Sequence, residues 1–169
     1  SPSQITLRPF TPDDADDLLS WAGDDRVTRN LTWDTLTSKE EAITFIQQVC
    51  IPHPWRRCIC IDNRSIGFVS VWPGSQDQRC RGDIGYAIGF KYWGQGIATI
   101  AVKMAIPQVW KDFPEIVRLQ AVVKVENKAS QRVLEKAGFT KEGLLRKYMY
   151  FKGNILDLFL FSILSTEVC

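Results

Sequence analysis

A glycine-rich turn at residues 92–99 holds the residues of this sequence best suited to bind a phosphate group. Gly94 and Gly96 stand between a run at 83–88 that is typical of a strand and a run at 100–110 that is typical of a helix. The first backbone N–H groups of a helix have no partner within it, and the helix dipole adds positive potential there. Glycine lets a pyrophosphate approach the backbone because no Cβ stands in the way. The turn therefore predicts a site for a phosphate-bearing cofactor.

Three phosphate-binding patterns compete for this turn. No Lys-Ser or Lys-Thr pair follows the glycines, so the P-loop pattern of nucleoside triphosphatases is absent. The dinucleotide fingerprint GxGxxG matches Gly94 and Gly96 but has Thr99 at its third glycine position, with Glu126 as the acidic residue that it expects further on. The pattern [QR]-x-x-G-x-[GA] matches residues 93–98 at every position except the first. The glycines alone do not decide whether the cofactor is a nicotinamide dinucleotide or another phosphate-bearing molecule.

A second segment separates these patterns. Residues 125–139 resemble the N-x-x-S…G-F signature of the GCN5-related N-acetyltransferases (GNAT). Further segments resemble the RimJ/RimL-like branch of that superfamily and follow its order: residues 5–10, 33–42, and 143–146 with Lys152-Gly153. The resemblance covers essentially the whole chain, and residues 51–57 resemble plant members of the branch.

The resemblance implies acetyl-CoA as the acyl donor, an amine acceptor, and no metal. The amine would attack the thioester directly in a ternary complex, so that proximity supplies much of the acceleration. A backbone N–H near Ile88 would stabilise the oxyanion, and Asn127 would hydrogen-bond the pantetheine arm. The cofactor-binding residues implied in this way are Ile88, Gly94, Gln95, Gly96, Ile97, Ala98, Thr99, Asn127 and Ser130.

Two catalytic residues are implied by the same resemblance. Ser130 matches a serine thought to protonate the departing thiolate; the alternative is a serine that caps the helix and contacts the cofactor. Asp83 matches a carboxylate that could act as the base, directly or through a water chain, and its alternative is a solvated charge at a strand end. Leu134 stands where many members carry a tyrosine. Met149 stands where the branch is proposed to carry a glutamate base, so that role is not transferred.

The acceptor is predicted from what the sequence contains and lacks. Trp33 and Trp55 fall in the region that covers the acceptor groove in relatives, as substrate-binding groove walls or as core residues. We see no dense acidic cluster that would suit a polyamine. An α-amine has a pKa of about 7.7–8.0, against about 10.4 for a lysine side chain, so it loses its proton more easily. We therefore expect a peptide N-terminus or a weakly basic small amine.

Composition is typical of a soluble globular protein. The 169 residues suffice for a single N-acetyltransferase domain over 1–169, and the net charge of +2 gives no reason to expect nucleic acid or membrane partners. Five cysteines, at positions 50, 58, 60, 80 and 169, favour reduced thiols in a cytoplasmic protein. Cys58 and Cys60 should share one face of a strand, too close along it for easy bridging, and CxC with the single histidine is poor zinc spacing. A monomer or a homodimer is expected.

The spacing of apolar residues, with the capping and turn residues between them, predicts an α/β fold with a mixed sheet. The expected order is β-α-α-β-β-β-α-β-α-β-β. Thr11-Pro12 begins the first helix, and the capping box at 38–41 begins the second. Runs at 58–61 and 66–72 form a hairpin, and a last pair of strands covers about 145–151 and 155–164. A Rossmann domain should instead open with the glycine-bearing βαβ unit. A non-catalytic acyl-CoA-binding module and a nicotinamide oxidoreductase are the alternatives to an acetyltransferase.

Overall fold

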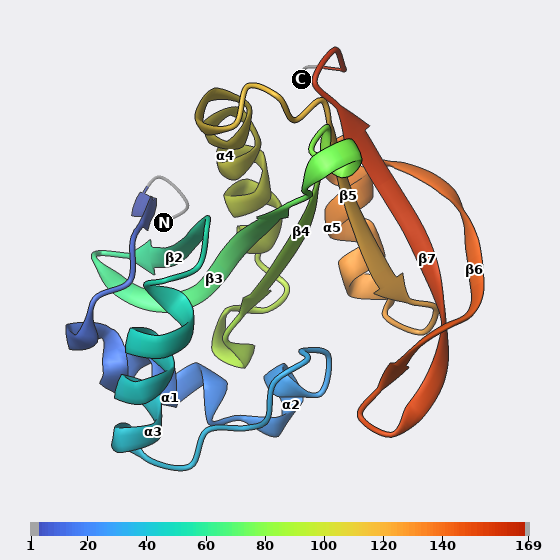
Figure 1. Cartoon of the computed structure of the whole chain (residues 1–169). Coiled ribbons are helices and arrows are strands. Elements are labelled where there is room, and N and C mark those ends of the chain that lie inside the picture. The colour runs from blue at the N-terminus through green and yellow to red at the C-terminus, as the bar shows by residue number, and fades with distance from the viewer. Residues whose placement is uncertain (1–3, 168–169) are drawn as a thin grey trace. The chain divides into compact units, whose positions relative to one another are not determined.

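The computed structural model, drawn in Figure 1, describes residues 4–167. The chain divides into two compact units. The first unit is the chain up to Val71 together with Gly85–Ala105. The second is Trp72–Ile84 together with the chain from Ile106 onward. Within residues 4–167, no helix is both long and apolar enough to cross a membrane.

The first unit pairs antiparallel strands with short helices. Strands β1 and β2 pair antiparallel, as do β2 and β3, and Asp62 and Asn63 turn the β2–β3 hairpin with φ of 51° and 63°. The hairpin and the two predicted helices are confirmed, whereas the sequence did not predict the short helix α2. The elements are β1 (Ile5–Arg8), η2 (Pro12–Asp14), α1 (Ala15–Ala22), α2 (Asp25–Thr28), α3 (Lys39–Phe45), η3 (Ile46–Cys50), β2 (Arg56–Ile61) and β3 (Arg64–Pro73).

The second unit contains a parallel strand pair. Strand β4 runs parallel to β5, and β7 pairs antiparallel with both β5 and β6. The seven strands form a mixed sheet, which confirms the predicted α/β fold class. The remaining elements are η4 (Gln76–Gln78), β4 (Arg81–Ile88), η5 (Phe90–Tyr92), α4 (Ile97–Asp112), β5 (Arg118–Lys124), α5 (Lys128–Lys136), β6 (Thr140–Phe151) and β7 (Asn154–Leu164).

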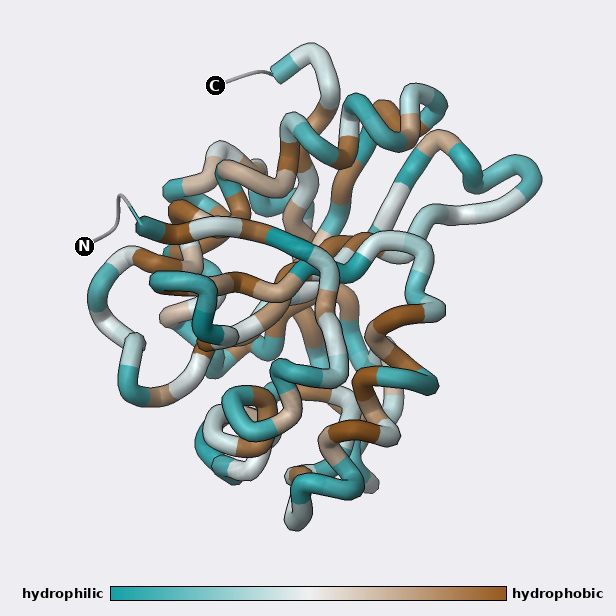
Figure 2. The backbone as a smooth tube through the Cα atoms, turned by 90° about the vertical axis from the view of Figure 1, so that its left-hand side faces the viewer, coloured by the Kyte–Doolittle hydropathy of each residue, from teal (hydrophilic) through white to brown (hydrophobic). Residues whose placement is uncertain are grey.

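Local sequence explains where several elements start and turn. Ser38 Oγ accepts the Glu41 N–H at 3.1 Å, so the predicted cap of α3 is present. The reciprocal half of the predicted capping box is wrong, because the Glu41 carboxylate accepts from the N–H and hydroxyl of Thr37. Lys152 and Gly153 both have positive φ, 48° and 89°, as a two-residue type I′ hairpin turn requires between β6 and β7. Apolar and hydrophilic segments alternate along the tube in Figure 2.

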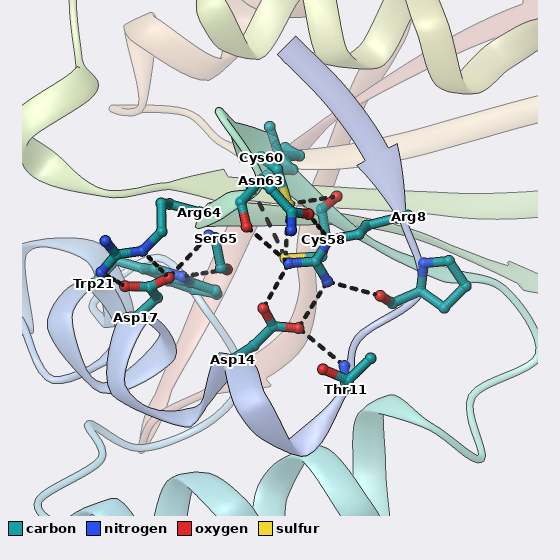
Figure 3. A network of polar contacts seen from close by, with 12 residues as sticks. Arg8, Thr11, Asp14, Asp17, Trp21, Cys58, Cys60, Asn63, Arg64 and Ser65 are labelled. Carbon is teal, nitrogen blue, oxygen red and sulfur yellow. Dashed lines mark hydrogen bonds and ion pairs between the residues drawn. The ribbon is translucent and has the colours of Figure 1, made fainter. Parts of the chain in front are cut away.

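An arginine ties the start of the helical region to the strands of the first unit (Figure 3). Arg8, the last residue of β1, holds the carboxylate of Asp14 through two bonds of 2.7 and 2.9 Å. Its Nε also donates to Asn63 Oδ1 in the β2–β3 turn at 2.7 Å. The same Asp14 accepts the Thr11 N–H, and its side chain is only 5% exposed. A bidentate, partly buried pair of this kind fixes geometry as well as adding stability.

A second arginine pair lies beside the first in Figure 3. Arg64 at the start of β3 donates to both carboxylate oxygens of Asp17 in α1, at 2.9 and 2.7 Å, and lowers the pKa of that carboxyl. The Ser65 N–H also donates to Asp17, and Ser65 Oγ accepts from Trp21 Nε1. Helix α1 is therefore fastened to β3 by side chains on two successive turns.

The predicted thiol pair lies in the core of the first unit. Cys58 and Cys60 are both fully buried, and their sulfur atoms are 3.5 Å apart. A disulfide bond is about 2.05 Å long, so the two thiols are in contact without being bonded. The pairing of β2 with β3 shifts by one residue between Ile59 and Cys60, where Ile66 of β3 is the extra residue. Among residues 4–167 no three His, Cys, Asp or Glu side chains gather to hold a metal ion, and Cys169 lies outside the described residues.

Strands β3 and β4 approach each other closely at one glycine, which yields a first prediction. A Cβ on Gly67 would overlap the carbonyl oxygen of Ala87 and lie 2.8 Å from Ile88 Cα. We expect Gly67→Ala to lower the free energy of unfolding by about 1–3 kcal/mol, the usual cost of overpacking. Gly85→Ala is the matched control, because its Cβ would meet only Ser70 Oγ at 4.0 Å. Urea titration measures both, and equal stability of the two variants would contradict the expected clash.

The single histidine predicts how stability depends on pH. Burial, followed by the nearby Arg56 charge, lowers the pKa of His53 to about 4. Its Nδ1 accepts the Trp55 N–H at 3.0 Å, so the neutral ring is the one that the fold uses. Below a pH of about 6.5 the unfolded chain binds a proton that the native ring does not, so stability is lost as the pH falls towards 4.

We expect that loss to amount to about 1–3 kcal/mol. In His53→Asn the amide oxygen still accepts the Trp55 N–H but has no charge to gain. The difference in unfolding free energy between wild type and variant, measured by urea at several pH values, isolates the histidine from the carboxylates. Parallel pH profiles of the two proteins would show that His53 titrates normally.

Candidate active site

The glycine turn has the backbone geometry that an anion site needs. Gly94 and Gly96 have φ of 77° and 76°, in the left-handed region that favours glycine. Gly96 supplies the carbonyl that accepts the Ile100 N–H, so the N–H groups of residues 97–99 have no partner inside α4. A Cβ on either glycine would meet nothing within 4 Å. Open space therefore lies over the turn at the positive end of a 16-residue helix.

A tryptophan side chain fastens this turn to the end of β4. Trp93 Nε1 donates to the carbonyl oxygen of Ile88 at 2.9 Å, and the Trp93 ring packs against Phe90 with centroids 4.9 Å apart. The next N–H, that of Gly89, donates to the Ile66 carbonyl at 2.7 Å. The peptide that joins Ile88 to Gly89 is thus held at both its carbonyl and its N–H. In the sequence, Trp93 is the one position that does not match the pattern [QR]-x-x-G-x-[GA]. The sequence gives no sign that its ring donates this hydrogen bond.

The side chain of Gln95 folds back on the same turn. Its Nε2 donates to the Lys91 carbonyl at 3.4 Å, which occupies the amide with the turn itself. Of the predicted cofactor-binding residues, those of the β4 end and the glycine turn therefore form one continuous segment of the first unit: Ile88, Gly94, Gln95, Gly96, Ile97, Ala98 and Thr99.

The asparagine of the predicted signature caps α5 in the second unit. Asn127 Oδ1 accepts the Ser130 N–H at 3.2 Å. The cap is therefore Asn127, and the alternative that made Ser130 the cap is wrong. The Asn127 side-chain amide group has no partner among residues 4–167, so it can donate to a ligand carbonyl. Gln131 Nε2 binds the last two carbonyls before the turn, and Leu134 is fully buried, so this helix face belongs to the core.

Asp83 belongs to a chain of polar side chains across the second unit. Its Oδ1 accepts from Gln120 Nε2 at 2.9 Å, and Gln120 Oε1 accepts from Arg118 Nε at 3.0 Å. Arg118 in turn pairs with Glu142, whose carboxylate also accepts from the Ser162 hydroxyl. Arg118 lowers the pKa of Glu142. These bonds link β4, β5, β6 and β7, and they account for Asp83 without any catalytic role.

The structure does not bring Asp83 close to the other catalytic candidate. Asp83 faces Gln120 near the start of the parallel β4–β5 pair, whereas Asn127 and Ser130 follow the other end of β5. Ser130 is the third residue of α5, one turn from Asn127. The role of Asp83 as a base stays a prediction.

Packing accounts for both tryptophans predicted to line the acceptor groove. Trp55 is only 1% exposed, and the Arg57 guanidinium lies 4.5 Å from its ring centroid. Trp33 stacks on Phe45 with centroids 4.2 Å apart and packs against the core of the first unit. The core alternative therefore describes Trp55, and contact of Trp33 with an acceptor stays a prediction.

Comparison with known proteins agrees with the resemblance found in the sequence. The family model described as "Acetyltransferase (GNAT) domain" matches residues 4–140. The uncharacterized N-acetyltransferase YoaA of Bacillus subtilis (strain 168) is 33% identical over 168 residues, which cover 96% of this chain and 94% of that protein. The putative ribosomal N-acetyltransferase YdaF of the same organism is 28% identical over 173 residues, 96% of this chain and 92% of that protein.

A solved structure agrees in fold. RimL, a ribosomal L7/L12 alpha-N-protein acetyltransferase in complex with coenzyme A, superposes with a TM-score of 0.82 at 21% identity, over 96% of this chain and 94% of that one. At this identity the likeness shows the fold alone. The resemblance to plant members stays a prediction.

The dinucleotide alternative does not fit this evidence. Antiparallel strands precede the glycine turn, whereas a Rossmann domain builds its site from consecutive parallel strands. The matched range includes the glycine turn, Asn127 and Ser130, and the similarity to YoaA extends over nearly the whole chain. This chain therefore belongs to the GNAT family of acetyltransferases.

Proposed function

We propose that this protein transfers the acetyl group of acetyl-CoA to the α-amine of a peptide or to a weakly basic small amine. The observation that carries the proposal is the turn at Gly94 and Gly96, with open space above it and N–H groups at residues 97–99 that have no partner inside α4. A pyrophosphate there would accept hydrogen bonds from the start of α4 and gain from the helix dipole.

The remaining contacts with the donor are those that the family resemblance implies. The free amide group of Asn127 would donate to a pantetheine carbonyl. Ile88, whose carbonyl accepts from Trp93 Nε1, would offer its own backbone N–H to the thioester oxygen. Such a donor would stabilise the negative charge that develops on the acetyl oxygen.

Ser130 would protonate the leaving group. The acceptor nitrogen forms a bond to the acetyl carbon, the carbon–sulfur bond breaks, and the sulfur takes a proton from the Ser130 hydroxyl. The ammonium formed on attack loses a proton to water, and Ser130 is reprotonated from solvent. Because Asn127 provides the helix cap, the Ser130 hydroxyl is not needed for capping.

Asp83 can act as a base only at a distance. Five residues of strand separate it from Ile88, which is about 16 Å at 3.3 Å per residue. A chain of water molecules would have to carry the proton. An α-amine with a pKa near 8 is partly neutral at physiological pH and depends little on such a relay.

A peptide N-terminus is favoured as the acceptor. YdaF and RimL are named for N-acetylation of ribosomal proteins, and both are similar to this chain over nearly its whole length. The test is a panel of N-terminal peptides, polyamines and small amines assayed with acetyl-CoA. Much faster turnover of spermidine than of any peptide would refute the proposal. Acetyl-CoA binding without turnover of any amine would instead favour a non-catalytic acyl-CoA-binding module.

The glycine turn predicts a binding defect. Gly96→Val should weaken acetyl-CoA binding at least about 100-fold, the loss of one or two hydrogen bonds to a charged group, because a branched side chain would fill the pyrophosphate position. Gly153→Val is the matched control, since Gly153 has a similar positive φ and equally open space but lies in the β6–β7 turn. Isothermal titration calorimetry measures both. Unchanged affinity in a folded Gly96→Val protein would remove the assigned pyrophosphate site.

The acid role of Ser130 predicts a loss confined to turnover. Ser130→Ala should lower kcat about 100-fold, the usual scale of general acid catalysis, with little change in acetyl-CoA affinity. Asn127→Ala should instead lower both that affinity and stability, the latter by about 1 kcal/mol for the lost cap. Asp83→Asn serves as a comparison, since a base defect shrinks as the pH rises towards the pKa of the acceptor. Wild-type kcat in Ser130→Ala would exclude the acid role, and a pH-independent Asp83→Asn defect would exclude the base.

A further inference from the structure

The β6–β7 hairpin exposes several large apolar side chains. Strand β6 ends the sheet and pairs only with β7, and none of its residues is buried. Tyr148, Tyr150 and Ile155 are 55%, 72% and 51% exposed. An edge strand offers unpaired backbone groups to another chain, and large exposed apolar side chains mark interaction surfaces.

A bulge in β6 turns side chains out of the hairpin. Leu145 faces Leu158 and Met149 faces Leu156, so residues 146–148 stand opposite Asp157 alone. Lys147 has a φ of 45°, which side chains rarely adopt. Its N–H donates to Asp157 Oδ1 at 2.7 Å, and this bond holds the bulge. Strained bulges next to functional sites commonly re-aim side chains, so this one calls for a functional explanation.

The bulge carries unpaired positive charge. Residues 146–157 contain three cations, Arg146, Lys147 and Lys152, and one carboxylate, a net charge of +2 that equals the net charge of the entire chain. The side chains of Arg146 and Lys147 are exposed and form no ion pair with any residue in 4–167. Lys124 lies alongside, with its Nζ 4.1 Å from the Phe151 ring centroid. The hairpin is therefore a basic surface with interleaved tyrosines.

This surface adjoins the turn that carries Asn127 and Ser130. Lys124 is the last residue of β5, and it pairs with Leu158 of β7. Asn127 follows three residues later, and its N–H donates to the Lys124 carbonyl at 3.0 Å. Figure 1 shows β5, β7 and β6 side by side in the second unit. A peptide whose amine reaches Ser130 would extend its next residues towards this hairpin.

We propose that the β6–β7 hairpin binds an acidic stretch of a peptide acceptor, a few residues after its acetylated N-terminus. This inference rests on the proposed function. Carboxylates of the peptide pair with Arg146 and Lys147, the tyrosines pack against its side chains, and its backbone pairs with the free edge of β6. A second copy of the hairpin is a poorer occupant, because a two-fold contact would place one +2 surface against another.

The experiment compares three decapeptides that share their first two residues and carry Glu, Gln or Lys at alternate positions from the third onward. We expect kcat/KM for the Glu peptide to exceed that for the Lys peptide at least tenfold at low ionic strength, mainly through KM. The ratio should shrink in high salt, because exposed ion pairs are screened. Arg146→Glu/Lys147→Glu should abolish or invert the preference.

Lys111→Glu/Lys136→Glu is the matched control, since it makes the same charge change at exposed ends of α4 and α5 and should keep the acidic preference. Thermal unfolding confirms that each variant folds. Equal kcat/KM for all three peptides, or equal behaviour of the two double variants, would overturn this inference and leave the proposed function standing. Acetylation of none of the peptides would overturn both. Tighter binding of single-stranded RNA than of the Glu peptide, lost in Arg146→Glu/Lys147→Glu, would assign the surface to nucleic acid instead.

Discussion

The proposed cofactor site depends on a turn that leaves the first N–H groups of α4 without a partner inside the helix. Most backbone donors of a folded protein find a partner, so such a turn must be held by contacts outside the helix. Gly94 and Gly96 provide the left-handed conformations without adding side chains. The ring nitrogen of Trp93 holds the turn to the end of β4, because it donates a hydrogen bond to the Ile88 carbonyl. The close approach of Gly67 to the Ala87–Ile88 backbone then fixes the strand end from which the turn departs.

The sequence predicted those features that depend on neighbouring residues. Glycines in a strand–turn–helix context, the Ser38 cap, and the Lys152–Gly153 turn each follow from local conformational preference, and each is present. The carboxylate of Glu41 shows where local preferences stop being sufficient, because it binds Thr37 and not the Ser38 N–H that a capping box requires. A glutamate at the third helical position can bind either of two preceding N–H groups, and only the path of the chain before the helix decides that it binds Thr37.

Features that depend on distant residues could not be predicted in this way. In the bulge at 146–148 the Lys147 N–H donates to Asp157, which lies on the opposite strand and ten residues further along the chain. Asp83 has a family position that suggests chemistry, yet its partner Gln120 lies on another strand and leads to Arg118 and Glu142. Trp55 could as well have lined a groove by its type, and only the packing around it makes it a core residue.

If the β6–β7 hairpin binds the acceptor as proposed, its charge also bears on how the amine loses its proton. Positive charge disfavours an ammonium group, so cations such as Arg146 and Lys147 lower the pKa of a nearby α-amine. A cation about 10 Å away contributes about 0.4 kcal/mol in a water-like dielectric, which lowers that pKa by about 0.3. The net charge of +2 over residues 146–157 would then lower the pKa by about 0.6, which raises the neutral fraction of an amine with a pKa near 8, while a lysine or polyamine with a pKa above 10 stays charged and is repelled. The same surface that attracts acidic residues further along the peptide would therefore select for the α-amine and reduce the need for a carboxylate base.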